Sequence, residues 1–236
     1  MKAQDAVEWH SEVADDFDSK YQKRAQFKDR QRVWERLIDK HSDADGRVLD
    51  LGCGGGVFAL HAAVRNRCVV GVDGSAEMLE ICARKIGNAG LANIDLVKGD
   101  VESVQGSVSG RFSLIICSSV LEYVEDLEGT MRSIGSMLAE NGVLIFSLPN
   151  ANSLYRKFEA ASFRLTGYPK YFRFVRNVCT VSEAYELVEE LGLLPTEHEF
   201  FGKPIFMPRS LGATSRLEFA HNLFAVVARR AGYSER

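Results

Sequence analysis

The chain has 236 residues, a length that suits one α/β domain with an appendage or two small domains. Apolar residues make up 46% of the sequence and charged residues 26%, which excludes a disordered chain, a collagen-like repeat and a small scaffold that needs disulfide bonds. The formal charge of −3 at pH 7 excludes a chain built as a whole to coat nucleic acid.

The five cysteines are scattered along the chain and include no CxxC pair. This usage predicts reduced, mostly buried thiols in a cytoplasmic protein, and it indicates neither a disulfide framework nor a zinc site. The N-terminal segment has no apolar stretch flanked by basic residues, so we expect no signal peptide. No run of apolar residues approaches the length that crosses a bilayer.

Two helices are predicted within residues 5–41, which are rich in charge and carry apolar residues at helical spacing. The apolar positions, first of one helix and then of the other, are Val7, Val13, Ala14 and Phe17, followed by Phe27, Val33, Trp34, Leu37 and Ile38. We expect residues 1–43 to form an N-terminal helical cap.

Short runs of β-branched and other apolar residues alternate with helical segments from Arg47 onward. The strand candidates are Arg47–Leu51, Val69–Asp73, Ile94–Lys98, Phe112–Cys117, Gly142–Leu148, Glu197–Phe201 and Leu223–Ala228. The helix candidates are Val57–Val64, Ala76–Ile86, Leu127–Ala139 and Ser182–Leu191, with Ser75 as an N-cap and Gly90 and Asn141-Gly142 as helix stops. This alternation predicts an α/β fold with a doubly wound, mostly parallel seven-stranded sheet in a domain of residues 44–236.

An insert at residues 151–180 interrupts this rhythm after the fifth strand. Six basic side chains stand there against one acid, Glu159, so the local charge is +5 while the rest of the chain carries about −8. The side chains from Tyr171 to Val178 divide into an apolar and a basic helical face, which predicts a lid helix over a substrate pocket. The sharper alternatives are an anionic acceptor, or a lipid-like one approached at a membrane surface. A second apolar loop, residues 200–208, would extend such a pocket.

A glycine-rich loop follows the first strand, at residues 52–56, and leads into a helix. Glycines let the backbone adopt positive φ and approach a ligand closely, although a tight turn alone would also use them. Asp50 lies directly before the loop, where a carboxylate would repel a phosphate and attract a cationic amine. Val57 replaces the third glycine of the dinucleotide fingerprint, and no GxxxxGK(S/T) sequence is present. The loop therefore favours an amine-bearing ligand over NAD or a nucleoside triphosphate.

Two further acids end the next two predicted strands. Asp73 comes 21 residues after Gly52, where it can accept both hydroxyls of a ribose, although an acid beside Ser75 would also favour the start of a helix. Asp100 closes the third strand and suits the exocyclic amine of an adenine. Strand interiors are poor in Asp, so three acids at three strand ends indicate one ligand at the carboxyl edge of the sheet.

Together with residues 118–124, these features resemble class I S-adenosylmethionine-dependent methyltransferases over residues 44–148. The resemblance implies that S-adenosylmethionine is the cofactor and S-adenosylhomocysteine the product. It implies the following contacts: the methionine amine and chain with Asp50, Gly52, Gly54 and the backbone at Ser118, the ribose with Asp73, Gly74 and Met78, adenine with Asp100 and Val101, and the methionine carboxylate with Tyr21.

The segment Leu121-Glu122-Tyr123-Val124 resembles the LEHV-type segment of the ubiquinone-biosynthesis O-methyltransferases and their relatives. Tyr123 stands in place of the usual His of that segment, and tyrosine, with an ordinary pKa of about 10, is a poor base at neutral pH. Glu122 is the alternative base or acceptor-binding group, unless it serves only as a carboxylate in the first turn of the next helix. We keep Glu122 and Tyr123 as catalytic candidates and predict no metal site.

The sequence thus predicts an enzyme that methylates a small-molecule acceptor, on oxygen or nitrogen, with transient membrane contact as an open option. Nucleic acid is not an expected partner, because the Pro-Pro-aromatic segment of amino-directed nucleic-acid methyltransferases is missing after the fourth strand. The remaining alternatives are a nucleic-acid or protein methyltransferase, an NAD-dependent oxidoreductase on the same fold and a binding module without activity. The identity of the acceptor and the oligomeric state stay open.

Overall fold

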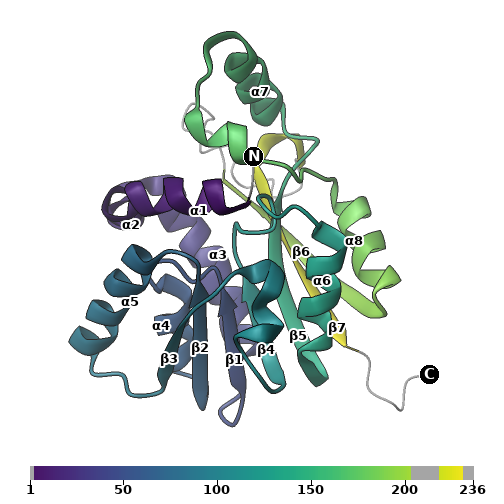
Figure 1. Cartoon of the computed structure of the whole chain (residues 1–236). Helices are drawn as coiled ribbons and strands as arrows, with labels where there is room; N and C mark the ends of the chain where they lie inside the picture. The colour runs from purple at the N-terminus through teal and green to yellow at the C-terminus, as the bar shows by residue number, and fades with distance from the viewer. Residues whose placement is uncertain (1–2, 203–217, 231–236) are drawn as a thin grey trace.

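Seven strands form one sheet in the order β3-β2-β1-β4-β5-β7-β6 (Figure 1) in a computed structural model that describes residues 3–202 and 218–230. The strands are β1 (Arg47–Leu51), β2 (Cys68–Asp73), β3 (Ile94–Lys98), β4 (Phe112–Cys117), β5 (Leu138–Pro149), β6 (Leu193–Phe201) and β7 (Leu223–Arg230). Strands β1 to β5 pair in parallel, and β7 is antiparallel to both β5 and β6. The predicted doubly wound, mostly parallel sheet is confirmed.

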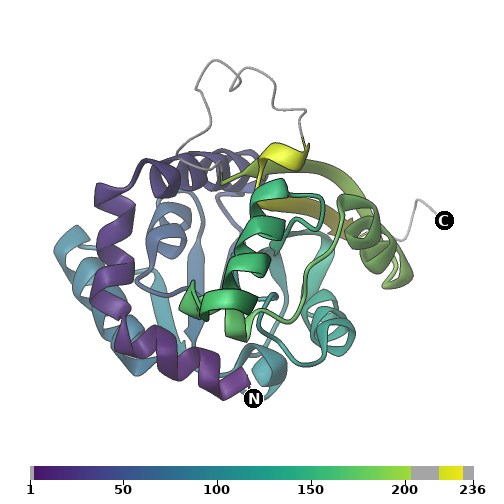
Figure 2. The same cartoon turned by 90° about the horizontal axis from the view of Figure 1, so that it is seen from above.

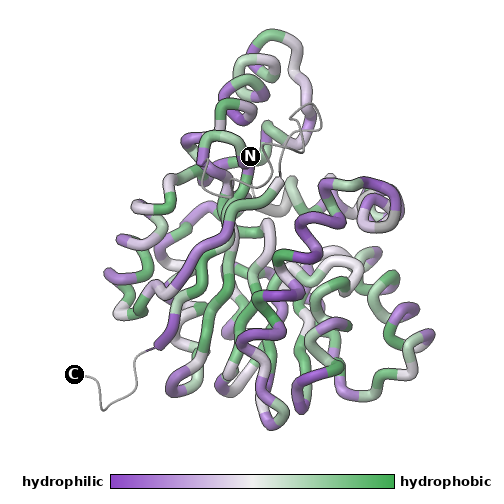
Figure 3. Tube along the Cα trace, turned by 180° about the vertical axis from the view of Figure 1, so that it is seen from behind, coloured by the Kyte–Doolittle hydropathy of each residue, from purple (hydrophilic) through white to green (hydrophobic). Residues whose placement is uncertain are grey.

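The helices cover both faces of this sheet. They are α1 (Ala3–Glu12), α2 (Ala14–Lys23), α3 (Ala25–His41), α4 (Val57–Ala63), α5 (Ala76–Ala89), α6 (Leu127–Ser136), α7 (Leu154–Thr166) and α8 (Val181–Glu190), with 3-10 turns η1 (Val101–Gly106), η2 (Lys170–Phe174) and η4 (Glu218–Ala220). Successive strand residues point to opposite faces, so Val48 joins the core under α3 and α4, while Leu49 joins the core under α6 and α8. Figure 3 shows hydrophobic residues concentrated along the central strands.

The N-terminal segment forms three helices, so the prediction of two was wrong. The first predicted helix breaks at Val13, whose φ of −112° and ψ of 15° leave the helical range, and α3 begins only after the extended residue Arg24. Trp34 is fully buried against the sheet and anchors α3. Figures 1 and 2 show α1 and α2 lying over the edge of the sheet where the parallel strands end.

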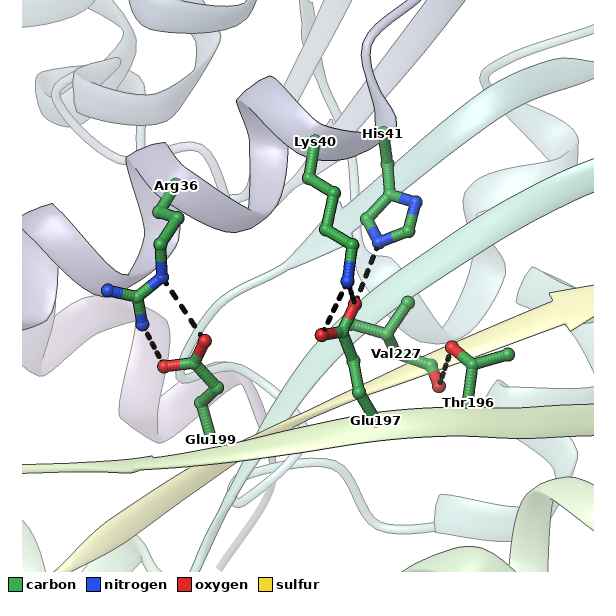
Figure 4. Close-up of polar contacts among 7 residues, drawn as sticks. All are labelled: Arg36, Lys40, His41, Thr196, Glu197, Glu199 and Val227. Carbon is green, nitrogen blue, oxygen red and sulfur yellow. Dashed lines mark hydrogen bonds and ion pairs between the residues drawn. The ribbon is translucent and has the colours of Figure 1, made fainter. Parts of the chain in front are cut away.

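Ion pairs join α3 to β6 at the surface (Figure 4). Nζ of Lys40 lies 2.7 and 2.8 Å from the two carboxylate oxygens of Glu197, and Nε2 of His41 lies 3.1 Å from one of them. Arg36 pairs with Glu199 in the same way. Exposed pairs of this kind contribute about 0–1 kcal/mol each, so they add little to the stability of α3.

The insert after β5 differs from its prediction. Its helix is α7, whereas the predicted helical face from Tyr171 to Val178 is a 3-10 turn that ends in an extended residue, Val175. The reason is a competing partner: the backbone amides of Arg176 and Asn177 donate hydrogen bonds to the carbonyl oxygen of Glu122, at 2.7 and 3.2 Å. The insert therefore returns to the core at the loop after β4.

Element bounds differ elsewhere by short stretches. Helix α6 ends at Ser136, before the predicted stop at Asn141, because Leu138 already pairs with Phe112 as the first residue of β5. Ser75 caps α5 and Gly90 ends it, as predicted. Residues 203–208 of the predicted apolar loop lie outside the described part of the chain. No described helix combines the length and the apolar character that a membrane span requires.

Candidate active site at the carboxyl edge of the sheet

A cavity of about 340 Å³ lies at the carboxyl ends of the parallel strands. Its wall is built by the segments that follow β1, β2, β3 and β4, together with side chains from α1, α2 and α3. Of the twelve predicted site residues ten line it, namely Tyr21, Gly52, Gly54, Asp73, Gly74, Met78, Asp100, Val101, Ser118 and Tyr123. Asp50 and Glu122 are the two that do not.

The glycine loop forms the floor of this cavity. Gly52 and Gly54 have φ of +66° and +51°, a region that favours glycine. A Cβ on Gly52 would lie 2.1 Å from Cγ2 of Val120, so the loop after β4 packs directly on that glycine. A Cβ on Gly54 would meet only Sδ of Met78, at 3.9 Å. The backbone at Gly54 is thus left open toward the cavity, which suits close approach by a ligand.

Asp73 ends β2 and is held by backbone amides. Its Oδ2 accepts a hydrogen bond of 2.8 Å from the Gly54 N–H, and its Oδ1 accepts one of 2.9 Å from the Ser75 N–H. Burial raises the pKa of the Asp73 carboxyl, against the amides of Ser75, Gly54 and Gly74, which favour the ionised form. The carboxylate therefore has a fixed orientation on the cavity wall.

Asp50 lies behind the glycine loop, away from the cavity wall. Its side chain is 1% exposed, and its Oδ2 has no hydrogen-bond partner. Burial, together with the neighbouring charge of Asp73, raises the pKa of Asp50 to about 8, against the Ala59 amide and the Arg30 charge, which lower it. Asp50 does not line the surface that a ligand would touch, and its raised pKa favours the protonated form at neutral pH.

The segment after β3 forms the next part of the wall. Asp100 caps η1, because its Oδ1 accepts a hydrogen bond of 3.0 Å from the Glu102 N–H. Val101 is buried directly behind it. Both residues line the cavity, as does Met78 from the first turn of α5. The acid and the apolar side chains predicted for an adenine and a ribose are thus brought together here.

Arg30 of α3 is a site residue that the sequence analysis missed. Its Nη2 donates hydrogen bonds to the hydroxyl of Ser118 at 2.7 Å and to the carbonyl oxygen of Ser118 at 3.3 Å. Its guanidinium carbon lies 5.9 Å from the ring centroid of Tyr21. Phe27, Arg30 and Trp34 follow helical spacing, so an arginine on the apolar stripe of α3 was the signal that could have identified it.

Tyr123 and Glu122 lie on the loop after β4. Tyr123 lines the cavity, with its ring centroid 5.4 Å from that of His10 on α1, and burial raises the pKa of its hydroxyl. Glu122 is 3% exposed, with Oε2 unpartnered, and burial raises the pKa of its carboxyl despite the charges of Arg156 and Arg30. Among the described residues, no group of three metal-binding side chains exists.

Comparisons with known proteins agree with this geometry. A family model described as a methyltransferase domain matches residues 21–198. The ubiquinone biosynthesis O-methyltransferase of Chromobacterium violaceum is 32% identical to the chain over 118 residues, which are 50% of either sequence. The chain thus spans about half the length of this curated relative.

Two solved structures have a similar fold. Magnesium protoporphyrin IX methyltransferase from Synechocystis, with S-adenosylhomocysteine bound, has a TM-score of 0.71 at 14% identity and covers 97% of this chain and 99% of its own. The cyclase SpnF has a TM-score of 0.74 at 16% identity, and the match covers 98% of this chain and 97% of the SpnF chain. At such low identity these likenesses show the fold alone.

Proposed function

The chain belongs to the family of methyltransferase domains, and from this premise we propose that it transfers a methyl group from S-adenosylmethionine to a small-molecule acceptor. The observation that carries the proposal is the cavity whose wall joins the open backbone at Gly54 to the fixed carboxylate of Asp73. We further propose that residues 1–43 act as a cap and residues 151–180 as a lid.

The residues of the cavity fit the cofactor. We assign the ribose hydroxyls to Asp73, beside Gly74 and Met78, and adenine to Asp100 and Val101. The methionine chain would lie over Gly52 and Gly54, where the backbone is open. An ammonium group bound near Asp50 would favour the ionised form of this buried carboxyl and so lower its raised pKa.

The methionine carboxylate is assigned to the cationic side of the cavity. Arg30 supplies a guanidinium there, already oriented by its two hydrogen bonds to Ser118, and Tyr21 lies under it. Arg30 and Asp50 lie within electrostatic reach of each other, and this pair matches the carboxylate and the ammonium that the methionine moiety carries on one carbon. This match of charge is what a phosphate-bearing dinucleotide would lack.

Bound S-adenosylmethionine supplies an activated methyl group on its sulfonium. The chain itself must exclude water and hold the acceptor atom about 3–3.5 Å from the methyl carbon, in line with the sulfur. The cap contributes Ala6, His10 and Tyr21 to the cavity wall, so it closes the site from above.

Proton transfer on the acceptor side involves Glu122 and Tyr123 in this proposal. Tyr123 stays protonated, since burial raises its pKa, so it serves as a wall and hydrogen-bond donor. Burial raises the pKa of Glu122, and a carboxylate with a raised pKa is a stronger base. Once an acceptor is identified, Tyr123→Phe is expected to keep kcat within about threefold, whereas Glu122→Gln lowers kcat at least tenfold. An equal loss of kcat in the two variants would contradict the different roles proposed for Glu122 and Tyr123.

The lid also carries the membrane contact that we propose. Leu154, Phe158 and Leu165 lie on one stripe of α7 and are 58%, 67% and 86% exposed. They stand among the basic side chains of the insert, a pattern that suits the interface of an anionic membrane. Such contact would occur on the cytoplasmic face and would let a lipid-like acceptor reach the site.

The proposed function is tested by calorimetry with S-adenosylhomocysteine and with NAD, followed by methyl transfer from labelled S-adenosylmethionine to pools of small molecules, RNA and protein. We expect S-adenosylhomocysteine to bind with a micromolar Kd and NAD not to bind. We expect methyl transfer to a small molecule only. Binding of NAD in its place, or transfer to RNA or protein, would overturn the assignment. Binding without transfer to any pool would indicate a module that lacks activity.

A further inference from the structure

We propose that the methyl acceptor carries a carboxylate and that Arg156 of α7 binds it. The inference rests on the proposed function, because it names the chemical class of the acceptor for the same site. It is carried by a buried guanidinium whose Nε and Nη1 have no hydrogen-bond partner.

Arg156 is unusually placed for an arginine in a surface insert. Its side chain is 7% exposed, whereas Lys157 and Arg164 of the same helix are exposed. Its Nε and Nη1 are buried and have no hydrogen-bond partner. A buried charge is retained when something pairs with it, so these two N–H groups call for an anionic partner.

Aromatic and acidic side chains surround Arg156. The ring of Phe172 lies 5.9 Å from the guanidinium carbon. Glu159 is engaged through Oε1, which accepts a hydrogen bond of 2.9 Å from the Tyr171 hydroxyl. Burial raises the pKa of both Glu159 and Glu122, against the charge of Arg156, which lowers both, so burial works against either carboxyl serving as a permanent anionic partner of Arg156.

Tyr123 connects this place to the cofactor cavity. It lines the cavity beside His10, and the charge of Arg156 lowers the pKa of its hydroxyl against the larger effect of burial. Arg156 therefore lies within electrostatic reach of the cavity wall. The charge of Glu122 raises the pKa of the same hydroxyl, and Oε2 of Glu122 has no hydrogen-bond partner. An acceptor with a carboxylate toward Arg156 and an O–H or N–H toward Glu122 would satisfy both orphaned groups.

The experiment uses the full chain and two probes of equal shape, benzoate and benzamide, which differ in charge. Binding is measured by calorimetry at constant ionic strength, with and without saturating S-adenosylhomocysteine. We expect wild type to bind benzoate with a millimolar Kd, at least tenfold tighter than benzamide. Arg156→Met should abolish this preference, and Arg164→Met, an exposed arginine on the same helix, should keep it.

Several outcomes would overturn the inference: no preference for benzoate in wild type, a preference that survives in Arg156→Met, or one that is lost equally in Arg164→Met. Should the methionine variant fail to fold, Arg156→Gln keeps a polar side chain without the charge and is expected to lose the preference as well. The affinity for S-adenosylhomocysteine separates the two levels of the argument. Loss of benzoate preference with that affinity intact contradicts only the carboxylate, whereas failure of wild type to bind S-adenosylhomocysteine contradicts the proposed function.

Discussion

The amide nitrogen of Gly54 donates a hydrogen bond of 2.8 Å to Oδ2 of Asp73. This bond ties the loop after β1 to the end of β2, so the orientation of the acid depends on the glycine loop. With the Ser75 N–H on Oδ1, each carboxylate oxygen accepts one backbone hydrogen bond, and each keeps lone-pair capacity for hydroxyl groups in the cavity.

Replacing Asp73 tests the ribose assignment. Asp73→Asn is expected to weaken binding of S-adenosylhomocysteine at least tenfold, because a neutral amide is a poorer acceptor for two hydroxyls. It should weaken the binding of 5′-methylthioadenosine to a similar degree, since this compound keeps the ribose and lacks the amino acid. Calorimetry checks both affinities. Asp95→Asn, an exposed acid on β3, is the control and should leave both unchanged.

Replacing Arg30 tests the opposite end of the cavity. Arg30→Met removes the guanidinium proposed to face the methionine carboxylate, so we expect at least tenfold weaker binding of S-adenosylhomocysteine. Binding of 5′-methylthioadenosine should change less than threefold, because it has no carboxylate. Arg32→Met, at an exposed position on α3, provides the comparison. Equal weakening of both ligands by Arg30→Met would argue for a purely structural arginine.

Gly54→Ala separates backbone strain from the loss of ligand space. Gly54 and Gly90 both have positive φ, and alanine in that region costs about 1–2 kcal/mol of folding free energy. Both variants should therefore unfold at lower temperature by a similar amount. Only Gly54→Ala should weaken the binding of S-adenosylhomocysteine, by tenfold or more, because its Cβ enters the open side of the loop. Unchanged affinity would show that the ligand does not approach Gly54.

The buried Asp50 carboxyl predicts a pH dependence of stability. In the unfolded chain it loses its proton near pH 4, and in the folded chain burial and Asp73 raise its pKa to about 8. Between these values the folded state binds more protons, so the free energy of unfolding falls as the pH rises. The Asp50→Asn variant has no carboxyl to titrate at this position. Its free energy of unfolding should therefore rise relative to that of wild type by up to about 1.4 kcal/mol for each pH unit between these values. Thermal unfolding at pH 5, 6 and 7 checks the slopes, and parallel slopes would contradict the prediction.

The central strands of the sheet were predictable because burial on both faces leaves continuous apolar runs. Strands β1, β3 and β4 match their predicted bounds, and β5 and β6 begin earlier than predicted. Asp73 and Asp100 were identified for the same reason, since an acid that closes an apolar run is conspicuous in the sequence.

The parts that were missed depend on contacts between distant segments. A lone arginine such as Arg30 or Arg156 is solvated on most helices, and only tertiary packing shows that these two are not. The end of the insert was predicted to be helical because its side-chain pattern fits a helix. Its backbone amides instead find the carbonyl oxygen of Glu122, a partner that periodicity does not reveal.

The return of the insert to Glu122 bears on how new specificity could be engineered. The side-chain amide of Asn177 also donates hydrogen bonds to the carbonyl oxygens of Leu121 and Val124, at 2.7 and 2.9 Å. A foreign segment grafted between α7 and α8 would have to preserve this junction, because the loop it fastens carries Tyr123. Chimeras joined before Arg176 would keep these hydrogen bonds, whereas those joined beyond it would disturb the loop that carries Tyr123.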